Sequence, residues 1–255
     1  MKIVTLNINS INARIPYLLW FLEKQNPDIV LLQEIKTEYN TFPFFEINAA
    51  GYHAKVLGQK GYNGVAVLSK KEAKIIRENL PNLKDEQARY LEVLIGDVLY
   101  ISVYMPNGNP LGSEKFEYKL KFMDEFYEHV SKLLKEHEKI IIGGDLNVIL
   151  TKDDVYNEES FKNNALCDER AREKLTALKY LGFYDAFRVL HEKENGYTYW
   201  DYGPSAFAND FGMRIDYFFI SAKMLEKLAS CTVDRSLRKK EKPSDHTALV
   251  AEFEM

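Results

Sequence analysis

The sequence predicts an α/β fold in which two mixed β-sheets pack face to face with helices outside, a four-layer α/β sandwich. Two observations predict it. Strand-like apolar runs alternate with amphipathic helical patterns, and successive strands are joined both by tight turns and by helical crossovers. Crossovers give parallel neighbours and tight turns give antiparallel ones, so mixed sheets are expected. No Ser-, Gly- or Pro-rich linker divides the 255 residues, which predicts a single catalytic domain over residues 1–255.

The N-terminal half supplies four strand regions and one helix. A helix is expected over residues 14–25, because Ile15, Leu18 and Leu22 recur at helical spacing and Pro27 follows the end of the pattern. Strands are expected at residues 2–6, 28–33, 64–69 and 89–104, the last broken by a hairpin turn near Gly96.

Two further helices and a mostly β segment complete the chain. Ser113 is placed to cap a long helix with an apolar stripe through Phe116, Leu120, Met123, Phe126, Val130 and Leu133. A second capped helix, about residues 168–181, ends before Gly182, the residue favoured just beyond a helix. Strands are expected at residues 139–143, 197–200, 214–220 and 247–253.

Composition limits the classes of function. The chain is 46% hydrophobic and 28% charged, and no apolar run approaches the roughly 20 residues needed to cross a bilayer. Its strand-like start leaves no room for a signal peptide, so we expect a cytoplasmic protein with no membrane partner. Cys167 and Cys231 lie far apart and predict neither a disulfide framework nor a zinc site.

The net charge of −4 argues against a polyanionic partner, but the distribution of charge argues the other way. The basic stretch at residues 235–242 runs directly into Ser244-Asp245-His246 and would place positive charge beside a site there. A solvated loop is the alternative interpretation of this stretch.

Four polar clusters stand where apolar runs end: Asn7-Ile8-Asn9, Gln33-Glu34, Gly144-Asp145-Leu146-Asn147 and Ser244-Asp245-His246. Carboxylates and carboxamides at neighbouring strand ends provide the oxygen ligands that Mg²⁺ prefers. Asp145 follows two glycines that permit a sharp turn, and its carboxylate could take a proton from water. Taken singly, the asparagines and Asp145 are equally compatible with turns stabilised by their own side chains, and Glu34 with an exposed ion pair.

Two more positions complete the candidate site. His246 could donate to a phosphate oxygen if a carboxylate keeps it protonated, and Asp216 is the candidate partner. Tyr104 and Asn107 lie where a strand opens into a turn, from which a phenol and an amide can reach a phosphate. A structural ion pair and a half-buried core tyrosine are the alternative interpretations.

Together these motifs resemble the exonuclease III family of abasic-site endonucleases, within the wider exonuclease, endonuclease and phosphatase superfamily. The matching segments occur in the family's order and cover the chain from end to end. They are residues 6–10, 27–36, 63–66, 104–108, 144–147, 197–200, 214–217 and 243–246.

The resemblance implies a Mg²⁺-dependent DNA repair nuclease, with Mn²⁺ as the alternative metal. Such an enzyme cleaves the phosphodiester 5′ to an abasic site, leaves a 3′-hydroxyl, and in some members acts as a 3′–5′ exonuclease or 3′-phosphatase. The implied partner is double-stranded DNA with abasic sites or 3′ ends, bound by a monomer.

The resemblance also assigns roles to residues. The implied metal site comprises Asn7, Asn9, Glu34 and Asp245. Asp145 would orient or deprotonate the attacking water and Asn147 would position it; whether Asp145 or Tyr104 accepts the proton is left open. His246, held by Asp216, would contact the phosphate, as would Tyr104 and Asn107. The implied walls of the sugar pocket are Tyr199, Met213 and Ile215, for which core packing is the alternative.

Two departures from the family pattern accompany this assignment. Asn9 stands where many relatives carry Asp, and Met213 replaces an aromatic residue that often precedes the Arg-Ile-Asp segment. Three other functions are alternatives: an unspecific DNase I-like nuclease, an inositol or lipid phosphatase, and a non-catalytic nucleic-acid-binding module. The first is expected to use a second catalytic histidine that no motif supplies, and the last conflicts with the presence of Asp145, Asp216 and His246.

Overall fold

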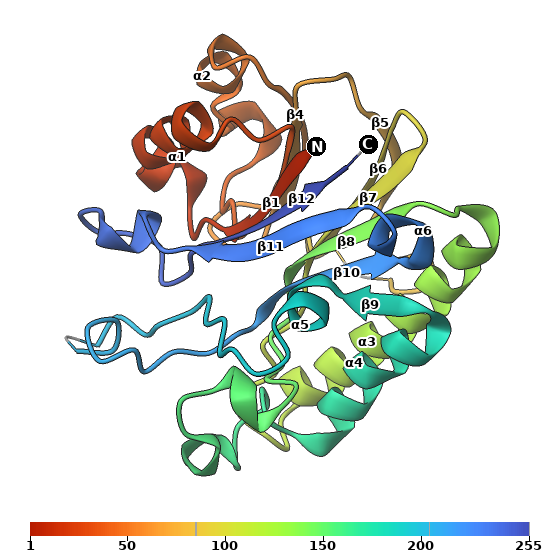
Figure 1. The fold of residues 1–255 in the computed structure, drawn as a ribbon, viewed down its shortest axis with the longest axis vertical. Helices are drawn as coiled ribbons and strands as arrows, with labels where there is room; N and C mark the ends of the chain where they lie inside the picture. The colour runs from red at the N-terminus through yellow and green to blue at the C-terminus, as the bar shows by residue number, and fades with distance from the viewer. Residues whose placement is uncertain (85, 204, 255) are drawn as a thin grey trace.

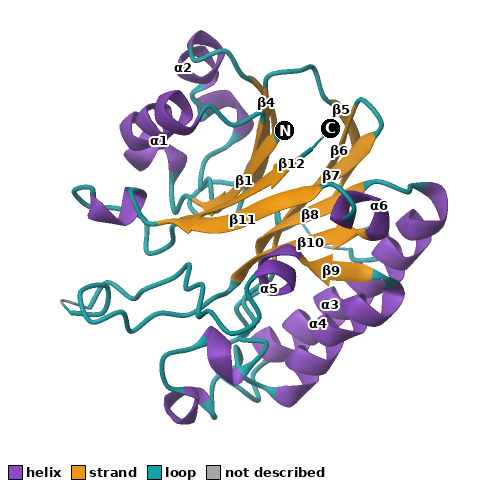
Figure 2. Cartoon of the chain, viewed as in Figure 1, coloured by secondary structure: helices purple, strands orange, loops and turns teal. Residues whose placement is uncertain are grey.

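Two six-stranded β-sheets face each other and helices lie on their outer sides (Figures 1 and 2). The structure is a computed structural model and describes residues 1–84, 86–203 and 205–254. The strand orders are β11-β12-β1-β2-β4-β3 and β5-β6-β7-β8-β10-β9. Both sheets contain parallel and antiparallel pairs, which confirms the predicted four-layer α/β sandwich.

The first sheet and its helices come from the two ends of the chain. Its strands are β1 (Lys2–Asn7), β2 (Ile29–Gln33), β3 (His53–Leu57), β4 (Val65–Ser69), β11 (Leu228–Asp234) and β12 (Ala248–Phe253). Helix α1 (Ile11–Gln25) connects the parallel pair β1 and β2, and α1 and the short α2 (Phe44–Ala49) pack on the outer face through an apolar cluster.

The second sheet is built from the middle of the chain. Its strands are β5 (Lys74–Glu78), β6 (Tyr90–Ile95), β7 (Val98–Tyr104), β8 (Ile140–Asp145), β9 (Phe183–Asp185) and β10 (Asp216–Ser221). The long α3 (Glu114–Glu136) connects the parallel pair β7 and β8, and α3 and α4 (Glu169–Leu181) cover the outer face. Short helices α5 (Ala186–Leu190) and α6 (Ala222–Leu225) flank β10, and single 3₁₀ turns lie at Tyr39–Thr41, Lys152–Asp154, Glu158–Phe161 and Leu237–Lys239.

Alternation along the strands directs the site residues inward. In β1, Val4 packs in the apolar cluster under α1 whereas Ile3 packs in the cluster between the sheets. Because strand side chains alternate, Asn7 shares the inner face with Ile3. The sheets come very close at Gly143 of β8, where an added Cβ would lie 2.6 Å from Leu31 Cδ1 of β2 and 2.7 Å from Phe218 Cε1 of β10, so a larger residue would have to displace these side chains.

Several predicted elements are confirmed and some are wrong. The long helix has the predicted apolar stripe, and α4 begins after Asp168, whose carboxylate caps Arg170 N–H, and ends at Gly182 with φ of 111°. Ser113 stands at the predicted N-cap position of α3, but its side chain makes no capping hydrogen bond, because its hydroxyl donates to the Pro110 carbonyl instead.

The predicted strand at residues 197–200 is also wrong. This segment makes only isolated bridges, from Tyr199 to Met213 and to His246, because its backbone divides its hydrogen bonds between two loops. The described part of the chain contains no helix long and apolar enough to span a membrane. Cys167 and Cys231 are both free and buried.

Candidate active site

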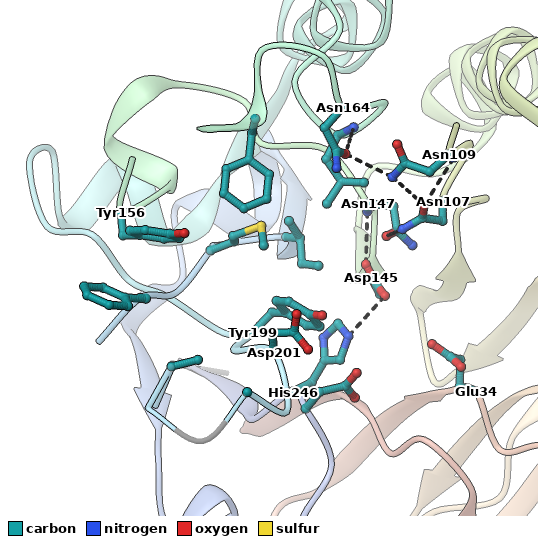
Figure 3. Close-up of a pocket in the computed structure, with 18 of the residues that line it drawn as sticks. Glu34, Asn107, Asn109, Asp145, Asn147, Tyr156, Asn164, Tyr199, Asp201 and His246 are labelled. Atoms are coloured by element: carbon teal, nitrogen blue, oxygen red, sulfur yellow. Dashed lines mark hydrogen bonds and ion pairs between the residues drawn. The ribbon is translucent and has the colours of Figure 1, made fainter. Parts of the chain in front are cut away.

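The polar clusters meet at one end of the two sheets, around a cavity of about 500 Å³ (Figure 3). Among the residues predicted from the sequence, its lining includes Glu34, Tyr104, Asn107, Asp145, Asn147, Tyr199, Met213, Ile215, Asp245 and His246. Asn7 and Asp216 are fully buried behind this lining, and Asn9 lies beside it in contact with Asp245.

The sheet topology explains why these residues meet. Parallel pairing aligns the ends of β1 and β2, and of β7 and β8, so that Tyr104 lies opposite Asp145. The antiparallel strand β10 begins with Asp216 opposite Asp145. Three residues just after strand ends, Asn9, Glu34 and Asn147, have φ of 46°, 49° and 49°. Such left-handed backbone in non-glycine residues is uncommon and concentrates at functional sites, where it aims side chains into a cleft.

The side-chain amide of Asn7 connects the two carboxylates of the site, Glu34 and Asp145. Asn7 Nδ2 donates to Glu34 Oε1 at 2.7 Å and to Asp145 Oδ2 at 3.0 Å, and so links the first sheet to the second. Side-chain atoms of Glu34, Asp145 and His246 lie within 4.8 Å of one another. Two carboxylates beside amide oxygens suit a hard divalent cation.

Positive charge already lies beside this cluster. The Lys36 ammonium is 2.8 Å from Glu34 Oε2 and donates to Asn9 Oδ1 at 2.7 Å. Burial raises the pKa of Glu34, but hydrogen bonds from Asn7 and Lys36 outweigh it and leave the pKa below its ordinary value. Glu34 is therefore an anion at neutral pH, the state that a metal ligand requires.

Asn9 and Asp245 form a neighbouring pair rather than part of the same cluster. Asn9 Nδ2 donates to Asp245 Oδ1 at 3.0 Å and to the Tyr202 hydroxyl at 3.0 Å. Through Lys36 the pair is connected to Glu34. The predicted metal ligands thus lie together at one rim, divided between a Glu34–Asn7 side and an Asn9–Asp245 side.

His246 lies between two buried carboxylates. Its Nδ1 is 2.8 Å from Asp216 Oδ2, and its Nε2 is 3.6 Å from Asp145 Oδ2. Burial lowers the pKa of the imidazole, but Asp216 and Asp145 raise it further than burial lowers it, to about 10. Figure 3 shows the imidazole directed toward Asp145. The edge of the Tyr199 ring packs against this imidazole with the centroids 5.0 Å apart.

Asp145 is held on both oxygens. Oδ1 accepts from the Asn147 backbone N–H at 3.0 Å and Oδ2 accepts from Asn7. Burial, followed by the charges of Asp216 and Glu34, raises the pKa of Asp145 to about 7 against the opposing effect of His246. A carboxylate with a pKa near neutrality is suited to accept a proton from water.

Tyr104, Asn107 and Asn147 complete the polar lining of the cavity. Burial and the charges of Glu34 and Asp145 raise the pKa of the Tyr104 phenol well above its usual value, so the phenol stays protonated and acts as a donor. Asn107 Nδ2 donates to Asn147 Oδ1 at 3.1 Å, and Asn147 Nδ2 donates to the Met105 carbonyl at 2.9 Å. Both amides are therefore held in fixed orientations.

The predicted pocket walls face the cavity beside this machinery. Met213 and Ile215 are 7% and 2% exposed and pack together with Leu166 and with Tyr199 in one apolar cluster. Phe161 joins the same cluster. The softer Met213 side chain therefore lies in the lining, as expected from its position.

Sequence reasoning missed Lys119, which lies fully buried beneath the site. Its ammonium donates to the backbone carbonyls of Asn147 at 2.6 Å, Ala165 at 2.9 Å and Asn107 at 3.1 Å. Burial lowers the pKa of Lys119 to about 7. Lys119 stands three residues after Phe116 on the buried stripe of α3, so a charged residue on an apolar face was the signal that could have found it.

A buried ion cluster under the pocket wall was also missed. Arg214 Nε is 2.7 Å from Asp154 Oδ1 and its Nη1 is 2.8 Å from Asp185 Oδ2. Arg188 adds a second guanidinium 2.6 Å from Asp154. Asp154, Arg214 and the Asp185–Arg188 segment are far apart in sequence and carry no local pattern that predicts the cluster.

Comparison with known proteins identifies the family. A model of the Endonuclease/Exonuclease/phosphatase family matches residues 4–246. The chain belongs to this family. The family is metal-dependent, consistent with the acidic cluster at Glu34 and Asp145. The family resemblance and the enzyme class predicted from the sequence are confirmed.

Individual relatives match over the whole chain. Exodeoxyribonuclease III of Haemophilus influenzae is 34% identical, over 99% of this chain and 100% of its own. Among solved structures, the 3′ phosphatase NExo from Neisseria, bound to a product DNA hairpin, superposes with a TM-score of 0.98 at 35% identity, with both chains fully covered. An AP endonuclease from Archaeoglobus fulgidus gives 0.96 at 34% identity, also with full coverage of both chains.

Proposed function

We propose that this protein is a Mg²⁺-dependent DNA repair nuclease that hydrolyses the phosphodiester 5′ to an abasic site and also acts at 3′ ends. One observation carries the proposal: in one cavity, buried Asp145 lies between the Glu34–Asn7 pair and the His246–Asp216 pair. The names of the relatives, an exodeoxyribonuclease III, a 3′ phosphatase and an AP endonuclease, support DNA as the substrate.

The donor set fits a divalent cation. Glu34 and Asn7 would hold it, with Asp245 and Asn9 on the other side of the rim; when bound, the cation supplies positive charge for the leaving 3′-oxygen. Mg²⁺ is proposed because the donors are oxygens, and Mn²⁺ accepts the same ligands. His246 is not proposed as a ligand, because its Nδ1 is engaged by Asp216 and its pKa is raised.

Asp145 is the proposed proton acceptor. Its raised pKa suits it to take a proton from the attacking water, and Asn147 holds one of its oxygens through the backbone N–H. The high pKa of Tyr104 favours Asp145 over a phenolate in this role. Tyr104 is instead proposed to donate to the phosphate, together with Asn107.

His246 is proposed to stabilise the negative charge that develops on the phosphate. Asp216 holds Nδ1, which leaves Nε2–H directed into the cavity toward the position of a non-bridging oxygen. Donors fixed in this way stabilise a transition state by a few kcal/mol because they need no reorganisation. The lining of the cavity, over the described residues, contains His246 and no second histidine, which argues against a DNase I-like mechanism.

A duplex series tests the proposal. Duplexes with one abasic analogue, a recessed 3′ end or no lesion are incubated with Mg²⁺ or with EDTA. We expect incision 5′ to the analogue and shortening of the 3′ end with Mg²⁺ only, and incision that persists in EDTA would contradict the metal assignment. Asp145→Asn should lower turnover by orders of magnitude and leave DNA affinity nearly intact, since it removes the acceptor and keeps the shape of the side chain. A single domain, a monomeric state and a cytoplasmic location stay predictions.

A further inference from the structure

The cavity extends well beyond the catalytic groups. Its volume of about 500 Å³ falls in the range of pockets that enclose whole drug-sized ligands, roughly 300–1,000 Å³. Besides the acids and amides, it is lined by Tyr156, Phe161 and Phe211. Figure 3 shows Tyr156 across the pocket from Glu34. A phosphate and its sugar would occupy the Asp145 end and leave the far end open.

The far end is an aromatic surface. Tyr156 and Phe211 stack with their ring centroids 4.9 Å apart and their planes 27° apart. They are 41% and 46% exposed, although aromatic rings of this size are usually more deeply buried. The rings of Phe161 and Tyr156 pack edge to face with their centroids 5.9 Å apart. We call the stacked pair Tyr156 and Phe211 the aromatic shelf.

The backbone that carries the shelf is tied together by hydrogen bonds. The Tyr156 backbone N–H donates to the Gly212 carbonyl at 3.1 Å, and Val155 bridges Met213, so the two segments run side by side. The neighbouring residues Asp154 and Arg214 form the buried ion pair already described. Backbone pairing and the ion pair therefore fix the backbone from which both rings project.

We propose that the aromatic shelf stacks the nucleobase of the nucleotide whose 5′ phosphate lies at Asp145. The inference rests on the proposed nuclease function and extends it: the pocket accepts a base-bearing 3′-terminal nucleotide as well as a bare sugar. Every nucleobase has an apolar face, so stacking on fixed aromatic rings tolerates any sequence. Continuity of the shelf with the catalytic cavity places the base at the required end.

This inference is tested with two substrates, which differ only in whether the terminal residue carries a base. Both are duplexes with a recessed 3′ strand; one ends in a normal nucleotide and the other in a tetrahydrofuran abasic analogue. The readout is kcat/KM for removal of the normal terminal nucleotide divided by kcat/KM for removal of the abasic analogue. In the double variant Tyr156→Ala/Phe211→Ala this ratio should fall roughly five- to hundredfold, the range expected for one lost base–aromatic stack.

Two further variants complete the experiment. Tyr156→Leu/Phe211→Leu keeps the apolar volume without aromatic faces and should lower the ratio in the same direction even if the alanine pair does not fold. Tyr180→Ala is the matched control, because Tyr180 is 88% exposed on α4 and lies outside the cavity lining. It should leave both rates unchanged.

The outcomes separate this inference from the proposed function. Wild-type protein that removes neither terminus overturns the proposed action at 3′ ends and the shelf with it, whereas the duplex with an internal abasic analogue tests the incision activity separately. Wild-type protein that removes both, with an unchanged ratio in the leucine pair, overturns the shelf alone. Equal loss on both substrates also overturns it, since the rings would then support the wall of the pocket and not the base.

Discussion

Replacing Lys119 with Met tests how the protein holds a charge beneath its active site. Burial lowers the pKa of Lys119 to about 7, whereas the pKa of an unfolded lysine is about 10.4. Between these values the unfolded chain binds a proton that the folded chain does not, so the contribution of Lys119 to the unfolding free energy rises with pH.

The size of this effect follows from the same titration. One proton of difference corresponds to about 1.4 kcal/mol per pH unit. The folded group is still half protonated at about pH 7. The unfolding free energy of the wild type should therefore rise by about 2 kcal/mol relative to that of Lys119→Met between about pH 7 and about pH 9. The variant also leaves three backbone carbonyls without the donor that Lys119 supplies, an added cost of about 1–3 kcal/mol for each unsatisfied group.

Urea unfolding at several pH values measures both effects. The difference in unfolding free energy between wild type and Lys119→Met is plotted against pH, and the exposed Lys115→Met on the same helix is the control. We expect a rising difference for Lys119 and a flat one for Lys115. A difference for Lys119 that stays constant from neutral to alkaline pH would refute the reasoning.

Three further predictions concern the site and its support. Asp216→Asn removes the main charge that raises the pKa of His246 to about 10. Activity that needs the imidazolium is lost as pH rises through this pKa, so the alkaline limb of kcat/KM should move to lower pH in the variant. An alkaline limb that does not move would contradict the role of the His246–Asp216 pair. Asp154→Asn leaves the Arg214 guanidinium with one carboxylate fewer in the interior and should cost about 3–5 kcal/mol by urea unfolding; a cost below about 1 kcal/mol would show that the pair is not structurally important. Mg²⁺ that binds only the folded state should raise Tm, and EDTA should reverse the rise in the wild type; an equal rise in Glu34→Ala would place the metal elsewhere.

Local patterns were sufficient to predict most of the architecture. Buried strands such as β2 and β8 are continuous apolar runs, and α3 has an apolar stripe over its full length. The wholly exposed β5 was missed, because a strand without a buried face has no apolar alternation to detect. The segment at residues 197–200 was predicted to be a strand because aromatic residues favour strands, but its backbone forms bridges with two loops instead of joining a sheet.

The site could be predicted to the extent that its residues stand at strand ends. Glu34, Asp145 and His246 were found in this way, and the structure brings their side chains within 4.8 Å. The partners of Arg214 were not found, because Asp154 is 60 residues away and Asp185 is 29, and nothing in the local sequence connects them. Such a cluster depends on the three-dimensional path of the loops.

Gly143 makes the catalytic spacing a property of how the two halves of the molecule fit together. Leu31 of one sheet packs against β8 of the other at this glycine, two residues before Asp145, while Glu34 follows β2 on the opposite side. A methyl group at position 143 would meet side-chain atoms of Leu31 and Phe218 at 2.6 and 2.7 Å and so disturb the packing between the sheets. Changes at Gly143 should therefore affect both the packing of the core between the sheets and the spacing of the catalytic residues that follow β2 and β8.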